Sequence, residues 1–328
     1  MRPPLLSVRG LTVDFTTRRG IVHVLDGVSF EVGAGEIVGI IGESGSGKSV
    51  TAYAVTGILE HSARIRGGEV LFEGRDILHL SRRARESWRG SEASIIFQNP
   101  RAALNPIRSV GAQIADVIAR HCPGSAAEIR KLTLAAMRQV RIADPEQRME
   151  AFPFELSGGL CQQVGIAMAL ACAPRLLIAD EPTTGLDVTT QAVIMDLIRS
   201  LAREQGMSIA LITHDLALAA EYCNRLVIMH AGHVVETAKT EDITRRPRHP
   251  YTAKLLRSVP SLVDGIDELQ AVDGSLPDLL RDDLPFCRFA ERCDRRMPLC
   301  DAEKLNLVPL GGEDAEQPSH LIACRNPL

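Results

Sequence analysis

The sequence has few aromatic residues and no long apolar run. Phe, Trp and Tyr make up 4% of its 328 residues. No window approaches the roughly 18 uninterrupted apolar residues that a membrane-spanning helix needs. The N-terminus, MRPPLLSVRG, also lacks the long apolar segment of a secretory signal peptide. We therefore expect the chain to stay in the cytosol and to meet a membrane only through another protein.

A strong net charge is missing as well. The 37 Lys and Arg residues against 41 Asp and Glu residues give a net charge of −4. This balance gives no electrostatic reason to expect nucleic acid as a partner. With 45% hydrophobic and 24% charged residues, the chain has the composition of an ordinary globular protein. Eight cysteines do not indicate a disulfide framework, because cytosolic thiols are kept reduced.

Short apolar runs alternate with helical patterns along most of the chain. EIVGIIG is a continuous apolar run, as expected for a strand that is buried on both faces of a parallel sheet. RLLIAD, MSIALIT and RLVIMH repeat this pattern, and helical sequence separates them. Ile194, Leu197, Ile198 and Leu201 fall on one face of one of these helices. The pattern predicts an α/β core in which helices cover a parallel sheet.

Two changes in the pattern predict the domain organisation. In residues 108–172 apolar residues recur three and four positions apart, which indicates a helical insertion. Beyond about residue 260 the chain becomes acidic, with 14 Asp or Glu residues against 7 Lys or Arg residues. We therefore expect a core with an N-terminal β-subdomain, a helical subdomain and a small C-terminal tail domain. In order, these comprise residues 1–107 with 173–259, residues 108–172, and residues 260–328.

A glycine-rich segment follows the first buried strand. Within IGESGSGKSV, residues 41–50, the pattern G-x-x-x-x-G-K-[ST] predicts a phosphate-binding loop for ATP. The glycines let backbone N–H groups converge on a phosphate, and Lys48 adds a cation. Ser49 supplies a hydroxyl for Mg²⁺ at the start of a helix, whose dipole favours the anion. The residues predicted to contact nucleotide here are Gly42, Glu43, Ser44, Gly45, Ser46, Gly47, Lys48, Ser49 and Val50.

Two adjacent carboxylates end a later apolar strand. RLLIAD delivers Asp180 and Glu181 to its carboxyl end, where α/β sheets place their ligands. We assign Asp180 to Mg²⁺, through water, and Glu181 to polarising the attacking water. General base catalysis of this kind is worth about 10²- to 10⁴-fold in rate. The structural alternative is a solvated acidic pair at a strand end.

Further motifs resemble those of the ATP-binding cassette (ABC) ATPases. ELSGGLCQQVGIAMAL is similar to their signature segment, and it lies just before LLIADEP, as that family requires. Gln98 in IIFQNP resembles the Q-loop, Asp187 in TTGLD the D-loop, and His214 in LITHD the switch histidine. Phe15 stands where the family stacks an aromatic ring on adenine. The resemblance implies an ABC-type P-loop cassette with a RecA-like core of mixed sheet and a helical subdomain.

The resemblance also implies how two cassettes share ATP. In this family ATP on one chain's P-loop is capped by the signature segment of the other chain. Ser157, Gly158 and Gly159 are then expected to contact the γ-phosphate across the interface, and the D-loop Asp187 to lie at the nucleotide. His214 is expected to contact the γ-phosphate from its own chain. Gln98 of the Q-loop is expected to connect Mg²⁺ and the attacking water to the surface on which a membrane partner acts.

The signature segment departs from the family pattern at three positions. Cys161 and Gln163 stand where the family usually carries basic residues, and Gly165 is expected to interrupt the helix. We expect the loss of positive charge to weaken the capping of the partner's nucleotide. The backbone donors of LSGG remain available.

Three segments resemble the peptide/nickel (oligopeptide and dipeptide permease) import ATPases: FQNPRAALNP, RRPRHPYTAKLL and CRFAERC. This resemblance implies a second ABC ATPase subunit, either a paralogue or an identical copy. It also implies two transmembrane permeases, an extracytoplasmic solute-binding protein, and a peripheral place on the cytoplasmic face of the inner membrane. Peptide import is the leading function. Import of nickel, another metal chelate or an opine stays open, as do a soluble ABC ATPase and a regulatory scaffold.

Four cysteines lie close together near the C-terminus, with the spacing C-x5-C-x6-C-x23-C. Structural zinc sites more often have C-x2-C pairs. Some members of the family group carry a [4Fe–4S] cluster on a similar tail, and four thiolates are its usual ligands. We therefore expect an iron–sulfur site, with zinc or unliganded thiols as the alternatives. The ligands would be Cys287, Cys293, Cys300 and Cys324.

Overall fold

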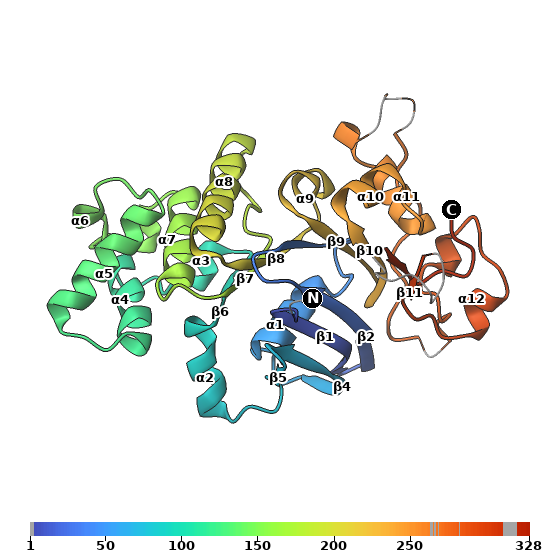
Figure 1. Cartoon of the computed structure of the whole chain (residues 1–328), viewed down its shortest axis with the longest axis horizontal. Helices are drawn as coiled ribbons and strands as arrows, with labels where there is room; N and C mark the ends of the chain where they lie inside the picture. Colours follow the sequence, from blue (N-terminus) through green and yellow to red (C-terminus); the bar gives the residue numbers. More distant parts are fainter. Residues whose placement is uncertain (1–2, 263–264, 266, 268, 282, 311–319) are drawn as a thin grey trace. The chain divides into compact units, whose positions relative to one another are not determined.

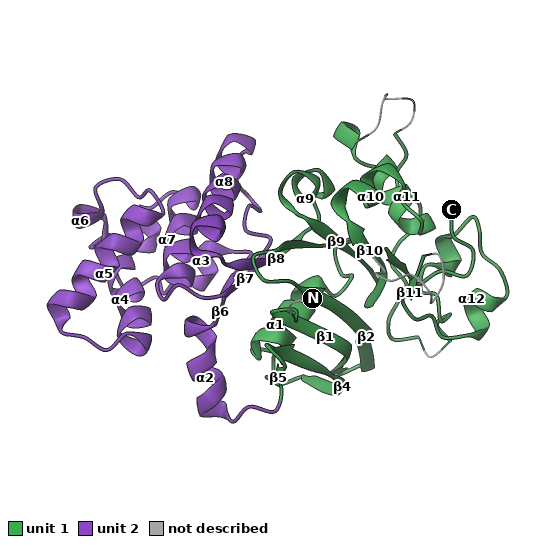
Figure 2. Cartoon of the chain, viewed as in Figure 1, with its two compact units in different colours: residues 1–78, 211–328 green, residues 79–210 purple. Residues whose placement is uncertain are grey.

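The structure is a computed structural model. It describes residues 3–262, 265, 267, 269–281, 283–310 and 320–328. The chain forms two compact units, shown in different colours in Figure 2: residues 1–78 with 211–328 form unit 1, and residues 79–210 form unit 2. The boundary between them falls within strand β8 (Ser208–Thr213). Among the described helices, none combines the length and the apolar character that crossing a bilayer requires.

Unit 1 begins with an antiparallel sheet in the strand order β2-β1-β4-β5 (Figure 1). Its long first hairpin, β1 with β2, buries apolar side chains such as Leu6, Val8 and Leu11. A short hairpin joins β4 to β5, in which Leu71 pairs with Asp76. The four strands are β1 (Leu6–Thr17), β2 (Gly20–Val32), β4 (Ala63–Phe72) and β5 (Arg75–Asp76).

A second group of strands in unit 1 supports the phosphate loop. β3 (Ile37–Ile41) is buried at every residue and pairs in parallel with β9 (Arg225–His230). β9 then turns back antiparallel into β10 (His233–Lys239). The continuous apolar runs of the sequence become these buried strands, as predicted. The helices of the same unit are α1 (Lys48–Thr56), α9 (Leu216–Tyr222), α10 (Thr240–Arg245), α11 (Pro250–Arg257) and α12 (Leu299–Ala302).

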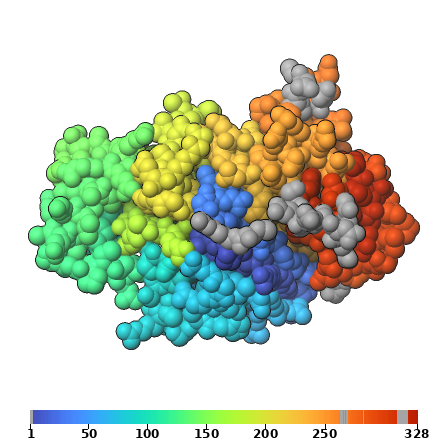
Figure 3. All heavy atoms as spheres, in the orientation of Figure 1, coloured from blue at the N-terminus to red at the C-terminus, as the bar shows by residue number. Residues whose placement is uncertain are grey.

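The C-terminal tail belongs to unit 1, so a separate tail domain is not evident. Its strand β12 (Leu321–Ile322) pairs antiparallel with β10, and β11 (Val308–Pro309) pairs with β12. The surface view shows the red tail directly against the orange segment near residue 250 (Figure 3). With little apolar sequence of its own, the tail is ordered by attachment to the core.

Unit 2 contains two parallel strands and the helices of the predicted insertion. β6 (Ala93–Ile96) pairs with β7 (Leu176–Asp180), so that Ile96 lies opposite Ala179. The apolar spacing of residues 108–172 gives α4 to α7, as expected from the pattern. The helices are α2 (Arg82–Ser91), α3 (Pro100–Ala103), α4 (Val110–His121), α5 (Ala126–Gln139), α6 (Pro145–Arg148), α7 (Gly158–Leu170) and α8 (Val188–Gln205).

Helix α7 runs through Gly165 without interruption, so the expected break is wrong. Most of the residues from Cys161 to Leu170 are buried, and this packing outweighs the weak helix propensity of one glycine. In α8 the predicted apolar face is confirmed, since Ile194, Leu197, Ile198 and Leu201 are at most 4% exposed.

Replacing Ile114 on α4 with Ala should lower the free energy of unfolding by about 2–5 kcal/mol. Its side chain is fully buried, so truncation leaves a cavity. Ile107, which is 82% exposed, gives a matched control, and Ile107→Ala should change stability by less than about 0.5 kcal/mol. Urea denaturation followed by circular dichroism measures both. Equal effects of the two substitutions would contradict the core assigned to unit 2.

Candidate functional site

The phosphate loop of unit 1 joins the buried strand β3 to helix α1. Lys48 opens the helix and is 5% exposed. Its Nζ donates to the carbonyl oxygens of Gly42 at 2.8 Å and Glu43 at 3.0 Å. Ser44 and Gly45 are exposed at the apex of the loop. The loop thus folds back on its own lysine, with the first turn of α1 directly behind it.

Two glycines are required by the packing of this loop. A Cβ on Gly42 would lie 2.2 Å from the carbonyl oxygen of Met229 on β9, which is closer than any real contact. Gly47 is the N-terminal cap of α1 at φ 99°, and a Cβ there would lie 2.6 Å from Leu25 on β2. The loop is therefore pressed against β9 and β2, and its N–H groups are held by backbone packing.

Ser46, Ser49 and Val50 complete the predicted loop residues. Ser46 is fully buried, and its Oγ has no hydrogen-bond partner in the described residues. Such a hydroxyl is costly to bury unless a ligand or water completes it. Ser49 and Val50 are half-buried in the first turn of α1.

Two other predicted residues of unit 1 lie outside the loop. Phe15 is half-buried near the end of β1, where it pairs with Val22 on β2 and Ala63 on β4. His214 is exposed and directly follows β8. The next residue, Asp215, caps α9 by accepting from the N–H of Leu218 at 2.9 Å. His214 is thus fixed between a strand and a capped helix.

In unit 2 the two predicted carboxylates directly end β7. Asp180 is fully buried and Glu181 is 9% exposed. Because β6 and β7 are parallel, their carboxyl ends meet at one edge, which brings Gln98 beside Glu181. Gln98 Nε2 donates to Glu181 Oε2 at 2.8 Å, and Thr184 Oγ1 donates to the same oxygen at 2.8 Å. The carboxylate is therefore oriented by two neutral donors.

The backbone at Glu181 is in a sparsely populated conformation. Its φ is 47°, in the left-handed region that a residue with a Cβ rarely adopts. Holding a residue there costs on the order of 1–3 kcal/mol, and such strain concentrates at functional sites. The carbonyl of Glu181 accepts from the N–H of Thr184 at 3.1 Å, which closes the turn. The turn directs the carboxylate to Gln98 instead of to solvent.

The signature segment and the D-loop lie beside each other in unit 2. Ser157 caps α7, and its Oγ accepts from the N–H of Leu160 at 3.3 Å. Gly158 and Gly159 open the helix, where backbone N–H groups have no intrahelical acceptor. A Cβ on Gly159 would lie 3.3 Å from the methyl group of Thr190 in α8, so this glycine allows close contact.

Asp187 has a structural role that the motif comparison did not indicate. It caps α8 by accepting from the N–H of Thr190 at 3.0 Å and from the Thr190 hydroxyl at 2.6 Å. These hydrogen bonds lower the pKa of Asp187. The sequence does carry a signal for this cap, since an Asp directly before a helical run is a common N-cap.

The predicted metal site in the tail is not supported by the arrangement of the thiols. All eight cysteines are free. Within the described residues, no group of three or more His, Cys, Asp or Glu side chains has an arrangement that holds a metal ion. The four tail thiols nevertheless lie in one region. Cys287 N–H donates to the Cys300 carbonyl at 2.9 Å.

Burial dominates the chemistry of these thiols. Burial first, and then the neighbouring Cys300, Cys324 and Cys293, raise the pKa of Cys287 to about 12. The pKa values of Cys293 and Cys324 are also raised, mainly by burial. Thiols with raised pKa values are protonated at neutral pH and are poor nucleophiles. Cys287 and Cys300 are buried, and Cys293 and Cys324 are half-buried.

Each unit therefore holds some of the residues that the sequence predicts to act in nucleotide hydrolysis. Unit 1 holds a braced phosphate loop with a lysine and a serine. Unit 2 holds an oriented carboxylate beside a buried one, as well as the N-terminus of α7. Sequence analysis missed three polar partners of these groups, Thr184 at Glu181 and Tyr251 and Arg292 at Glu43. Tyr251 and Arg292 are distant in sequence from their partner, and no local pattern points to them.

Two family models match the chain. The model described as ABC transporter matches residues 25–184. The model described as the C-terminal region of oligopeptide/dipeptide transporters matches residues 235–300.

Curated relatives match over nearly the full length. The chain is 45% identical to a probable peptide ABC transporter ATP-binding protein of Sinorhizobium fredii, covering 98% of this chain and 94% of that protein. It is 42% identical to the dipeptide transport ATP-binding protein DppD of Escherichia coli, covering 94% of each. It is 43% identical to the oligopeptide transport ATP-binding protein OppD of Salmonella typhimurium, covering 99% of this chain and 94% of the relative.

Solved structures match the cassette part. One is a dimeric post-hydrolysis state of the ATP-binding cassette MJ0796 bound to ADP and Pi, with a TM-score of 0.65 and 27% identity; the match covers 72% of this chain and 98% of that one. Another is cbiO1 from Clostridium perfringens, part of an ABC transporter complex, with a TM-score of 0.64 and 29% identity. That match covers 75% of this chain and 92% of the other.

Replacing Gly42 with Ala should abolish nucleotide binding, because the added Cβ would collide with the carbonyl of Met229 and displace the loop. Gly67 on the exposed part of β4 has no atom within 4 Å of such a Cβ, so Gly67→Ala serves as the control. Calorimetric titration with MgADP measures both. Wild-type affinity in the folded Gly42→Ala protein would show that the loop does not hold the phosphates.

Proposed function

The chain belongs to the ATP-binding subunits of oligopeptide/dipeptide ABC transporters, and on this premise we propose that its two units act in one cycle of ATP hydrolysis that powers peptide import. The observation that carries the proposal is the Glu181 carboxylate, held at the end of a buried strand by Gln98 and Thr184. A carboxylate so oriented is suited to act on a water molecule. The ABC cassette fold supports ATP hydrolysis as the reaction.

In the proposed cycle the phosphate loop binds the triphosphate of ATP. Its backbone N–H groups and the N-terminus of α1 face the anion, and Lys48 contributes a positive charge. Ser49 and the buried Asp180 suit Mg²⁺, because a hydroxyl and a carboxylate are ligands that this hard cation prefers. Mg²⁺, when bound, stabilises the negative charge on the transferring phosphate. Phe15 offers its ring to the adenine.

Glu181 is the proposed general base. It accepts a proton from water as that water attacks the γ-phosphate, and Gln98 and Thr184 hold the accepting oxygen in place. We propose that Gln98 also senses the nucleotide state and passes it to the permease surface. His214, exposed at the end of β8, contacts the γ-phosphate and favours the closed state.

We further propose that a second cassette completes each site. The N–H groups at the start of α7 have no partner within their helix, and they suit the γ-phosphate on a neighbouring chain. Around this segment, Phe154 is 74% exposed and Val188 is 82% exposed. We propose that the second cassette covers these two side chains. The neighbour is a paralogue or a second copy of this chain.

The proposed partners are those of a peptide importer. Relatives named as dipeptide and oligopeptide transport ATP-binding proteins support membrane permeases as partners. That there are two permeases, and a solute-binding protein on the far side of the membrane, is part of the proposal. The chain is then peripheral, held at the cytoplasmic face of the cell membrane by these permeases. The relatives favour peptides over the nickel, metal-chelate and opine alternatives, and they favour transport over a soluble ABC ATPase.

Changing Glu181 to Gln should reduce steady ATP turnover of the reconstituted transporter by at least about 100-fold, because the proton acceptor is lost. ATP binding should persist, since the amide keeps the shape of the side chain. Turnover is measured by phosphate release and binding by equilibrium dialysis with MgATP.

Glu204→Gln is the matched control, because Glu204 is an exposed glutamate of the same unit. It should leave turnover unchanged. Full turnover in Glu181→Gln, with loss of turnover in the equivalent variant of the partner cassette, would instead support a regulatory role for this chain.

The tail needs a chemical test of its own. The cluster hypothesis from sequence predicts brown, anaerobically purified protein with about four irons per chain. The arrangement of the thiols in the structure predicts colourless protein whose four tail thiols react with a thiol reagent after unfolding. Iron, sulfide and zinc analysis of the full-length chain separates these outcomes, and stoichiometric zinc would favour the zinc alternative.

A further inference from the structure

The C-terminal tail contacts the phosphate loop through a buried arginine. Arg292 lies in the short turn Ala290–Arg292, and 7% of its side chain is exposed. Its Nη1 donates to both carboxylate oxygens of Glu43, each at 3.1 Å. Glu43 is the second residue of the loop motif, directly after Gly42. A residue of the tail is therefore bonded to the element that is proposed to bind phosphate.

The same guanidinium has partners on two further segments. Nη1 lies 3.2 Å from Nε2 of His230, the last residue of β9. Burial, and then the charge of Arg292, lower the pKa of His230 to about 3, so the ring is neutral and its Nε2 accepts. Nε and Nη2 donate to the carbonyls of Asp273 at 2.7 Å and Val272 at 3.3 Å. Arg292 thus joins the loop, β9 and the tail.

Apolar contacts of the tail follow the same elements. A Cβ on Gly45, at the exposed apex of the loop, would lie 3.3 Å from Leu276 Cδ1. A Cβ on Gly20, the first residue of β2, would lie 3.7 Å from Leu280 Cδ2. The tail therefore runs from the apex of the loop to the hairpin that carries Phe15.

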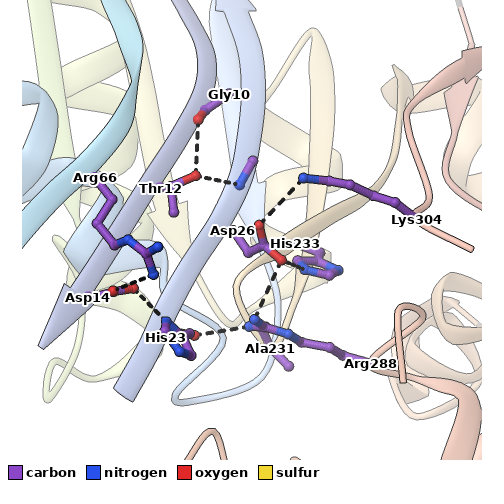
Figure 4. A network of polar contacts seen from close by, with 11 residues as sticks. Gly10, Thr12, Asp14, His23, Asp26, Arg66, Ala231, His233, Arg288 and Lys304 are labelled. Carbon is purple, nitrogen blue, oxygen red and sulfur yellow. Dashed lines mark hydrogen bonds and ion pairs between the residues drawn. The ribbon is translucent and has the colours of Figure 1, made fainter. Parts of the chain in front are cut away.

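A second arginine of the tail, Arg288, also bonds the core, and Figure 4 shows its contacts. Arg288 Nη1 donates to the carbonyls of His23 and Ala231, and its Nη2 lies 3.8 Å from Asp26. Asp26 also bonds His233, and this hydrogen bond is the largest cause of its lowered pKa. The tail is thereby attached to β2 and to the turn after β9, against which the loop packs.

An aromatic cluster stands behind these polar contacts. Phe289, 1% exposed, packs against the rings of His230, His249 and Tyr251 at centroid distances of 5.3, 5.9 and 5.2 Å. Tyr251 Oη accepts from the backbone N–H of Glu43 at 3.1 Å. Glu43 is thus held at its backbone by Tyr251 and at its carboxylate by Arg292.

We propose that Arg292 is a positioning residue for ATP binding, which holds the phosphate loop through Glu43 and couples nucleotide affinity to the docked tail. The inference rests on the proposed function, in which this loop binds the phosphates. The partners of Arg292 described above are protein groups, so its proposed effect on ATP is indirect, through Glu43. Without it, the Glu43 carboxylate, 26% exposed, loses its cation, and the nucleotide must order a looser loop. The cost of ordering the loop is the same for bound ATP and for the transition state. Loss of Arg292 should therefore raise KM for ATP and leave kcat unchanged.

The test measures MgADP affinity of the purified full-length chain by calorimetry. Arg292→Ala should raise the dissociation constant at least about fivefold, the lower range of typical site-to-site coupling. Arg296→Ala is the matched control, because Arg296 pairs with Asp301 on the exposed side of the tail, and it should bind as the wild type does. Arg292→Lys should recover part of the affinity, because lysine restores the positive charge but not the planar guanidinium that binds both carboxylate oxygens.

A double-mutant cycle tests whether Arg292 acts on nucleotide binding through Glu43. Glu43→Gln should weaken binding in the same direction, and Glu43→Gln with Arg292→Ala should be no weaker than Arg292→Ala alone, because the two residues act as one contact. In the reconstituted transporter, the Arg292 variants should raise KM for ATP while kcat stays within about twofold of the wild type.

Unchanged affinity and KM in folded Arg292→Ala protein would overturn the inference. Where that variant does not fold, wild-type affinity in both Arg292→Lys and Glu43→Gln would overturn it in the same way. Lys48→Ala separates this outcome from failure of the proposed function. If Lys48→Ala binds MgADP as the wild type does, the loop is not the phosphate site, whatever the Arg292 variants show.

Discussion

The loop that we propose to bind phosphate is held from behind by the strands it packs against, and this packing constraint organises much of unit 1. Gly42 and Gly47 press against β9 and β2 so closely that no Cβ fits. Lys48 bonds carbonyls of the loop itself, and Glu43 is held by Tyr251 and by the tail. Close packing makes the loop rigid before nucleotide arrives, which reduces the ordering cost of binding.

The proposed catalytic residues of unit 2 are positioned by a strained backbone and by hydrogen bonds. A buried strand ends in two carboxylates, and a left-handed backbone at Glu181 turns the second one toward Gln98. Two neutral donors orient the carboxylate without adding a competing positive charge. Asp187 and Ser157 each cap a helix beside this region. The polar motifs of the family thus also serve as caps, which fix the ends of α7 and α8.

Local patterns predicted much of the fold and the motifs, because strand burial, helix periodicity and the phosphate loop are all encoded in short stretches. The apolar residues of α8, which recur three and four positions apart, and the continuous apolar run of β3 are examples. The break expected at Gly165 was wrong, since tertiary packing outweighs the propensity of one residue. The pairing of β12 with β10 and the bond from Arg292 to Glu43 were not foreseen. Both join residues far apart in the sequence, where no periodicity reaches.

The central claim is that two cassettes share each nucleotide, with the loop of one chain and the signature segment of the other on the same phosphate. A cryo-electron microscopy map of the reconstituted transporter with MgADP and vanadate tests it most directly. The account predicts vanadate between Lys48 of this chain and the signature serine of the neighbouring cassette, with Ser157 placed over the neighbour's nucleotide. Vanadate held by a single cassette, with no neighbouring signature segment in contact, would contradict it.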